Sequence, residues 1–175
     1  MAQNIAPADS GLALRFLGVG NARASALGSA SAVLERGAMP QLLIDCGPRT
    51  LDDYAVHYAG ELPTAVFITH LHMDHIGGVE QLFYRTYFEQ RGRVQLFVPC
   101  ELIPALHYKL ANSPFVLSEG GANFWDAFRL VPVGDTFWLG DLLFKVFPVR
   151  HSGYRAAFGL VLPGAFLYSG DTRPI

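Results

Sequence analysis

The chain has 175 residues, 51% hydrophobic and 16% charged, with a formal net charge of −2. This length suits a single domain over residues 1–175, and the charge balance excludes a global basic field that would draw in nucleic acid. Cys46 and Cys100 make no disulfide framework, and neither a signal peptide nor an apolar run of the roughly 18 residues that span a bilayer is visible, so we expect a cytoplasmic protein with no membrane association.

The first part of the chain predicts the opening of a β-sheet. Apolar runs separated by Gly- or Pro-containing turns predict strands over 12–17, 29–35 and 41–47, joined as a meander. The third run is apolar at successive positions, which is typical of a strand covered on both faces. Thr50, followed by Asp53 three residues later, predicts the start of a helix over 50–58.

Strands also dominate the remainder, with helices spaced between them. We predict strands over 64–68, 94–98, 128–131, 142–147, 157–162 and 165–169, and helices over 78–90 and 101–110. Residues 112–123 are rich in Asn, Ser, Gly and Pro and are interpreted as a long loop. The pattern indicates a mixed α/β or α+β fold, and not an all-parallel one.

The stretch Ile68–Gly78 organises the sequence, because it holds three imidazoles and a carboxylate in the order His70, His72, Asp74 and His75. An extended backbone points residues two apart to the same side, while the next two ligands face a second point as the chain turns into a helix. Imidazole nitrogen and carboxylate oxygen suit Zn²⁺, which takes about four ligands. A lone His is more often an ordinary surface or core residue, but an uncompensated cluster would be unfavourable in a packed loop. We therefore predict a metal site that other segments complete.

Three further residues follow apolar strands and are candidates for that completion. His151 can supply a third imidazole to the site of His70 and His72, or be a strand-end histidine exposed to water. Asp171 can bridge two cations, or be a turn residue after Gly170. Asp45 can support the metal loop or cap a turn. We interpret His57, His107, Cys46 and Cys100 as ordinary residues.

The H-x-H-x-D-H order after a strand resembles the metallo-β-lactamase superfamily. The resemblance implies an αββα sandwich with the metals at one edge, and a hydrolase with one or two metals, usually zinc. It implies two sites, His70/His72/His151 and Asp74/His75/Asp171, with Asp171 bridging. It also implies Asp45 as a support of the metal loop.

Several short sequence segments resemble those of the ribonuclease Z branch of this superfamily. They are residues 16–22, 43–47, 68–72 and 168–174. Related phosphodiesterases and arylsulfatase-like members share them. Met73 occupies a position where ribonuclease Z usually has Gly. No Gly-rich, basic segment that would bind tRNA is evident in the sequence. The family continues beyond its Gly-Asp motif to a last histidine on the second metal, so we expect a fold that is incomplete at its C-terminal end, and association with a second copy or another chain.

The resemblance implies a phosphodiesterase of ribonuclease Z-like type that uses a metal-activated hydroxide, with RNA or a smaller phosphate ester as substrate. Two Zn²⁺ ions, with Mn²⁺ or Fe as substitutes, would form a binuclear centre, and Asp74 would hold or relay a proton as the catalytic residue. The alternatives are a hydrolase of a thioester, lactone or sulfate ester, and a non-catalytic subunit with an incomplete site.

Overall fold

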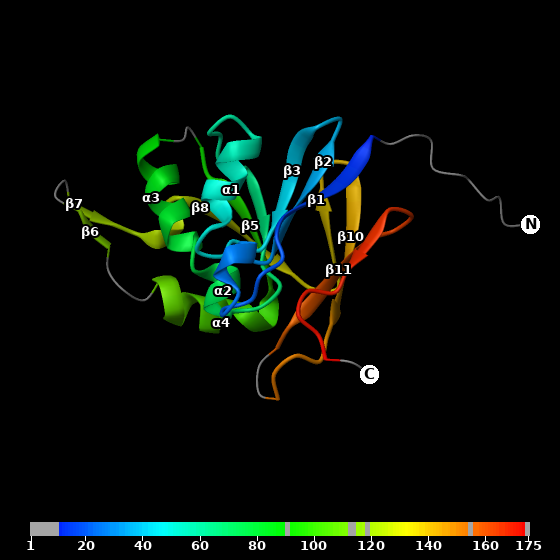
Figure 1. Ribbon diagram of the computed structural model, residues 1–175. Helices are drawn as coiled ribbons and strands as arrows, with labels where there is room; N and C mark the ends of the chain where they lie inside the picture. The colour runs from blue at the N-terminus through cyan, green and yellow to red at the C-terminus, as the bar shows by residue number, and fades with distance from the viewer. Residues whose placement is uncertain (1–10, 90–91, 112–114, 118–119, 154–155, 174–175) are drawn as a thin grey trace, which may run out of the picture.

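Two β-sheets form the frame of the protein in a computed structural model, which describes residues 11–89, 92–111, 115–117, 120–153 and 156–173 (Figure 1). The first sheet has the order β1-β2-β3-β4-β5-β8. Its strands are β1 (Leu12–Gly18), β2 (Ser31–Arg36), β3 (Met39–Ile44), β4 (Ala65–Phe67), β5 (Val94–Pro99) and β8 (Phe128–Val133). The first three strands pair antiparallel, as the predicted meander requires, and the others pair parallel.

The second sheet is antiparallel and has the order β12-β11-β10-β9. Its strands are β9 (Thr136–Leu139), β10 (Leu142–Pro148), β11 (Phe158–Leu162) and β12 (Phe166–Tyr168). A separate hairpin pairs β6 (Phe115–Leu117) with β7 (Gly120–Ala122).

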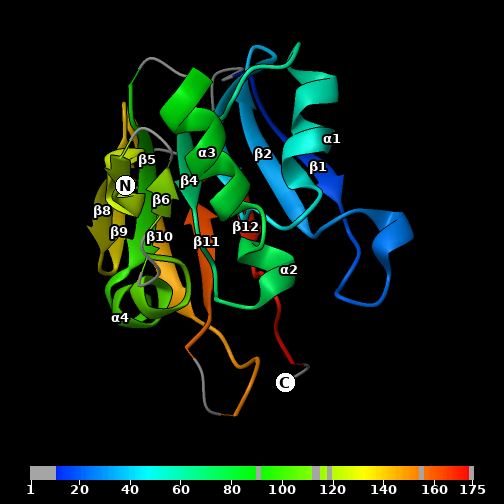
Figure 2. The ribbon, with the colours of Figure 1, turned by 90° about the vertical axis from the view of Figure 1, so that its left-hand side faces the viewer.

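The helices lie against the face of the first sheet that is turned away from the second (Figures 1 and 2). They are α1 (Thr50–His57), α2 (Met73–Ile76), α3 (Val79–Glu89) and α4 (Ile103–Leu106). Short 3-10 turns occupy η1 (Ser25–Leu27), η2 (Cys100–Leu102) and η4 (Phe124–Asp126), and the π-helical segment η3 covers His107–Ala111. The layers are therefore helix, sheet, sheet, and no helix covers the second sheet among the residues described.

Burial explains the apolar runs of the central strands. Ala65, Val66 and Phe67 of β4 are all buried, because helices cover one face of the strand and the second sheet covers the other. Phe137 of β9 joins the two sheets: its ring lies 5.6 Å from that of Phe67 and 4.8 Å from that of Phe144 on β10, and is nearly parallel to both. This aromatic contact packs the two sheets against each other.

The structure corrects three of the predicted elements. The strand β9 was missed because it has only four residues, although buried Phe137 and exposed Trp138 alternate along it. The segment 112–123 is not one long loop, since it contains β6 and β7; residues 112–114 and 118–119 lie outside the described residues. The predicted helix 101–110 is a series of three short helical segments, η2, α4 and η3.

Candidate metal centre

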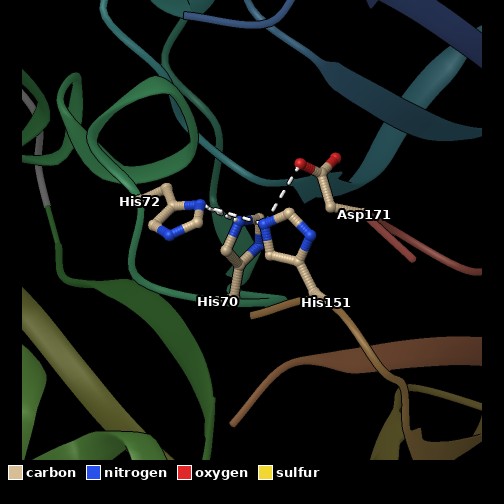
Figure 3. A group of neighbouring side chains, drawn as sticks. All are labelled: His70, His72, His151 and Asp171. Carbon is tan, nitrogen blue, oxygen red and sulfur yellow. Dashed lines mark hydrogen bonds and ion pairs between the residues drawn. The ribbon is translucent and has the colours of Figure 1, made fainter. Parts of the chain in front are cut away.

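Three strand ends meet at one edge between the two sheets. His70 and His72 follow β4, His151 follows β10, and Asp171 follows β12. A backbone hydrogen bond of 3.0 Å from Phe158 to Thr69 ties the second sheet to the loop that carries His70. The predicted convergence of side chains from separate segments is therefore present (Figure 3).

Four side chains gather tightly at this edge. His72 Nδ1 lies 3.1 Å from His70 Nε2 and 3.0 Å from His151 Nε2, and His151 Nε2 lies 3.5 Å from Asp171 Oδ2. One nitrogen or oxygen of each residue falls within 4.8 Å of the others. Zinc with nitrogen ligands at about 2.1 Å in tetrahedral geometry keeps those ligands roughly 3.4 Å apart, so the spacing fits one metal ion.

Burial keeps the first two imidazoles neutral. It lowers the pKa of His70 to about 3, with a further contribution from neighbouring His75. Burial and the neighbouring His151 also lower the pKa of His72. A neutral imidazole offers a lone pair to a metal, so these side chains are ready to coordinate at neutral pH.

A second group surrounds the Nε2 atom of His75. This atom is buried and has no hydrogen-bond partner in the structure, and it lies 3.5 Å from Asp171 Oδ1 and 3.8 Å from Asp74 Oδ2. Burial opposes the charged form of His75, but the neighbouring carboxylates of Asp171 and Asp45 outweigh it and raise the pKa to about 10. An unsatisfied nitrogen between two carboxylates fits a second cation, with Asp171 reaching both positions.

Asp45 is the support of this loop and not a turn cap. Its buried carboxylate accepts hydrogen bonds from Thr69 N at 2.8 Å, from Thr69 Oγ1 at 2.7 Å and from His75 Nδ1 at 2.7 Å. The Asp45, His70 and His75 donor atoms also fall within 4.8 Å of one another. Because both Asp45 oxygens already accept hydrogen bonds, we assign it to the shell that orients ligands, where such partners are usual.

Backbone contacts hold the ligand loop in place. Cys46 N donates to His75 O at 2.7 Å, and Gly78 N donates to Cys46 O at 2.9 Å. Gly47 packs so closely on the backbone of Asp74 that a Cβ atom would overlap its carbonyl oxygen. The short helix α2 begins directly after His72 and carries Asp74 and His75, and the ring of His75 lies 4.1 Å from that of His70.

The loops of His151 and Asp171 are tied to each other. Arg173 N donates to Arg150 O at 2.6 Å, and Gly170 adopts a φ of 59°, which an L side chain rarely adopts, just before Asp171. The neighbouring imidazole of His75 lowers the pKa of Asp171 to about 2. The carboxylate is therefore charged at neutral pH, as a metal ligand must be.

A pocket of about 560 Å³ opens beside the cluster. The histidine loop forms one wall, and a helical segment from η2 to η3 forms the other. Its lining residues are His70, Leu71, His72, Glu101, Leu102, Ala105, Tyr108, Lys109 and Ala156. Glu101, Tyr108 and Lys109 were not among the predicted site residues, because their positions in a predicted helix over 101–110 do not reveal which side faces the histidines.

Residues interpreted as ordinary lie apart from the four-residue cluster. His57 is exposed on α1, His107 stacks on Trp125, Cys46 is buried and Cys100 is exposed. Among the described helices, none has both the length and the apolar character needed to cross a bilayer.

Sequence comparison places the chain near one family. Residues 12–175 match the family model described as "Anti-Pycsar protein Apyc1". A protein of that name from Paenibacillus sp. (strain J14) is 38% identical over 168 residues, which cover 91% of this chain and 66% of the relative. The chain thus spans about two thirds of the length of the curated relatives it matches, 66% in each of three cases.

Solved structures agree on the fold. The metallo-β-lactamase fold protein YhfI from Bacillus subtilis superposes with a TM-score of 0.63 at 15% identity, over 84% of this chain and 56% of that chain. Human tRNase Z, short form, gives 0.54 at 21% identity, over 86% and 65%. The expected α+β fold of the metallo-β-lactamase superfamily is confirmed. The matching family, however, is not the ribonuclease Z branch suggested by the shared phrases.

Proposed function

The chain belongs to the anti-Pycsar protein Apyc1 family, and from this premise we propose that it is a metal-dependent phosphodiesterase that opens the phosphodiester ring of a cyclic nucleotide. The observation that carries the proposal is the cluster of His70, His72 and His151 with Asp171, within 4.8 Å of one another beside a pocket. We infer the substrate class from the name of the relatives and from the size and charge of the site.

The residues present fit two cations, for which we propose zinc. His70, His72 and His151 would hold the first, Asp74 and His75 the second, and Asp171 both. When bound, such ions lower the pKa of water towards neutrality and polarise a phosphoryl oxygen. The chain's own task is to keep the imidazoles neutral and oriented. Burial lowers the pKa of His70 and so keeps it neutral, and the hydrogen bond from His75 Nδ1 to Asp45 orients His75.

Asp74 is the proposed proton carrier. Its carboxylate is 16% exposed and lies 3.8 Å from His75 Nε2, so it has contact with both the site and solvent. In ring opening, an oxygen from water bonds to phosphorus, one ester P–O bond breaks, and the leaving oxygen takes up a proton. Asp74 is placed to accept the proton of the attacking water and pass it on.

A small nucleotide suits the site better than RNA. The pocket volume of about 560 Å³ falls in the range of small-molecule sites. The chain's net charge of −2 gives no overall positive field of the kind that attracts a nucleic-acid backbone. The two unpaired cysteines suit a reducing compartment, so we place the activity in the cytoplasm.

The test is a substrate panel on the purified chain supplied with Zn²⁺ or Mn²⁺. It comprises cyclic mononucleotides, bis(p-nitrophenyl) phosphate, an RNA oligonucleotide, a thioester, a lactone and an aryl sulfate. We expect metal-dependent hydrolysis of the first two, with cyclic mononucleotides as the best substrates. Turnover of the thioester, lactone or sulfate alone would replace the proposal with the corresponding hydrolase. If the chain binds metal at the cluster and hydrolyses nothing, it is a non-catalytic subunit.

A further inference from the structure

The pocket wall opposite the histidine loop carries polar and aromatic side chains that the metal site does not use. Glu101, Ala105, Tyr108 and Lys109 line the pocket, and spacings of four, seven and eight residues place them on one side of a helical segment. The views agree that α2 and α4 lie at the same end of the first sheet (Figures 1 and 2). The wall therefore faces the loop of His70 and His72 across the pocket.

The end of this wall is π-helical from His107 to Ala111. Such turns are rare and occur often at functional sites, because the wider turn redirects side chains. Here a neighbouring aromatic holds the turn: Trp125 stacks on His107 with planes 5° apart, and Trp125 Nε1 donates to His107 Nδ1 at 3.3 Å. The next two residues, Tyr108 and Lys109, both line the pocket.

Lys109 brings a positive charge to the metal loop. Its Nζ donates to the carbonyl oxygen of Leu71 at 2.5 Å, and Leu71 lies between the two candidate ligands His70 and His72. The positive charge of Lys109 therefore lies beside the candidate ligands in the pocket lining, where it would attract an anionic oxygen bound there. A phosphate oxygen is the anion that the proposed reaction places there.

Tyr108 presents an aromatic ring at the mouth of the same pocket. It is 75% exposed although it is large and partly apolar, and it is adjacent in sequence to the lysine that reaches the metal loop. An exposed ring gains from stacking on the flat face of a nucleobase, which is worth roughly 5- to 100-fold in affinity for any of the bases. A phosphate held by Lys109 would leave the base of the same nucleotide within reach of this ring.

We propose that the helical wall 101–109 is the nucleotide-binding side of the pocket, in which Lys109 contacts the phosphate and Tyr108 stacks on the base. This inference rests on the proposed function for its substrate class, but it assigns binding roles that can be tested without turnover. It makes Tyr108 the residue by which the site distinguishes a nucleotide from a phosphate ester that lacks a base.

The test is titration calorimetry on the full chain supplied with Zn²⁺, using AMP, CMP and ribose 5-phosphate as probes. We expect the wild type to bind both nucleotides about tenfold more tightly than ribose 5-phosphate. Tyr108→Ala should remove this difference and leave the affinity for ribose 5-phosphate unchanged, while Tyr108→Phe should preserve the difference. Lys109→Met should weaken all three probes by a similar factor of roughly ten, with the metal content unchanged.

Tyr87→Ala is the matched control, because Tyr87 is an exposed tyrosine on α3 that does not line this pocket; it should change no affinity. Equal binding of nucleotides and ribose 5-phosphate by the wild type would overturn the role of Tyr108, as would a Tyr108→Ala variant that weakens all probes alike. Loss of metal in Lys109→Met would make the lysine a support of the loop and overturn its phosphate role.

Hydrolysis of cyclic nucleotides is measured separately from binding. If nucleotides bind through Tyr108 but cyclic nucleotides are not hydrolysed, the proposed function alone is refuted. If cyclic nucleotides are hydrolysed without these binding effects, this inference alone is refuted.

Discussion

Asp45 Oδ2 accepts a hydrogen bond from His75 Nδ1 at 2.7 Å, and both side chains are almost completely buried. The bond fixes the orientation of the imidazole and directs Nε2 towards Asp74 and Asp171. The same carboxylate holds Thr69, the residue before His70. Asp45, directly after β3, thus positions His75 and the loop of His70, which belong to different candidate metal sites, although it is not itself a proposed metal ligand.

Asp45→Asn should therefore weaken metal binding although the substituted residue is not a proposed ligand. The amide loses the charge that favours the hydrogen-bonded imidazole, and changes at such supporting positions typically cost about 10- to 100-fold in metal affinity. Competition with a chromogenic chelator measures this affinity. Asp141→Asn is the control, since Asp141 is an exposed partner of Arg36 directly before β10, whereas His151 follows the other end of that strand. Unchanged affinity in Asp45→Asn would contradict the assignment.

Removing a proposed ligand should abolish hydrolysis while the fold survives. We expect this of His72→Ala and of Asp74→Ala, because neither side chain caps α2 by a hydrogen bond and neither belongs to the hydrophobic core. Hydrolysis of bis(p-nitrophenyl) phosphate and far-UV circular dichroism provide the two readouts. His57→Ala is the matched control, as His57 is exposed on α1. Full activity in either variant after metal removal would refute the mechanism.

The metal-free protein should lose stability as the pH rises above neutral. His75 has a pKa of about 10 in the folded state against about 6.5 unfolded, so the folded state binds more protons between these values. Its contribution is fully present below about pH 6.5 and is lost as the pH approaches 10. Urea unfolding in EDTA at a series of pH values measures the effect. The slope should be smaller in His75→Gln; an equal slope in both proteins would assign it to other groups.

Phe137→Ala should destabilise the protein by about 3–5 kcal/mol, the usual cost of removing a buried phenylalanine. The ring is 6% exposed and contacts aromatic rings of both sheets. Chemical denaturation of the metal-free protein gives the free energy of unfolding. Trp138→Ala, at the next position of β9 and 62% exposed, should cost far less. Similar losses in the two variants would show that the sheets are not joined through Phe137.

Most strands and the convergence of the side chains could be predicted from the sequence, because His70, His151 and Asp171 each come soon after an apolar run. His70, His151 and Asp171 end segments whose burial pattern marks them as strands, and strand ends meet at sheet edges. The family motif added the pairing of ligands into two sites. The role of Asp45 stayed open between loop support and turn cap, since only the structure shows that its carboxylate accepts three hydrogen bonds.

The pocket wall was beyond sequence reasoning for a physical reason. Helical spacing predicts that Glu101 and Tyr108 share a side, but which side faces the metal loop depends on how the segment packs after β5 and on the π turn that ends it. Likewise, β9 is too short for its alternation of buried and exposed residues to predict a strand, and its antiparallel pairing with β10 is visible only in the structure. The branch was misjudged because short phrases around the metal loop are shared across the superfamily.

The most direct measurement follows a cyclic mononucleotide by ³¹P NMR during incubation with the purified chain and Zn²⁺. We expect the cyclic phosphate signal to be replaced by that of a nucleoside monophosphate, and the conversion to stop with EDTA or in His72→Ala. A wild-type chain whose cluster holds metal, yet leaves every cyclic mononucleotide intact, would contradict the account.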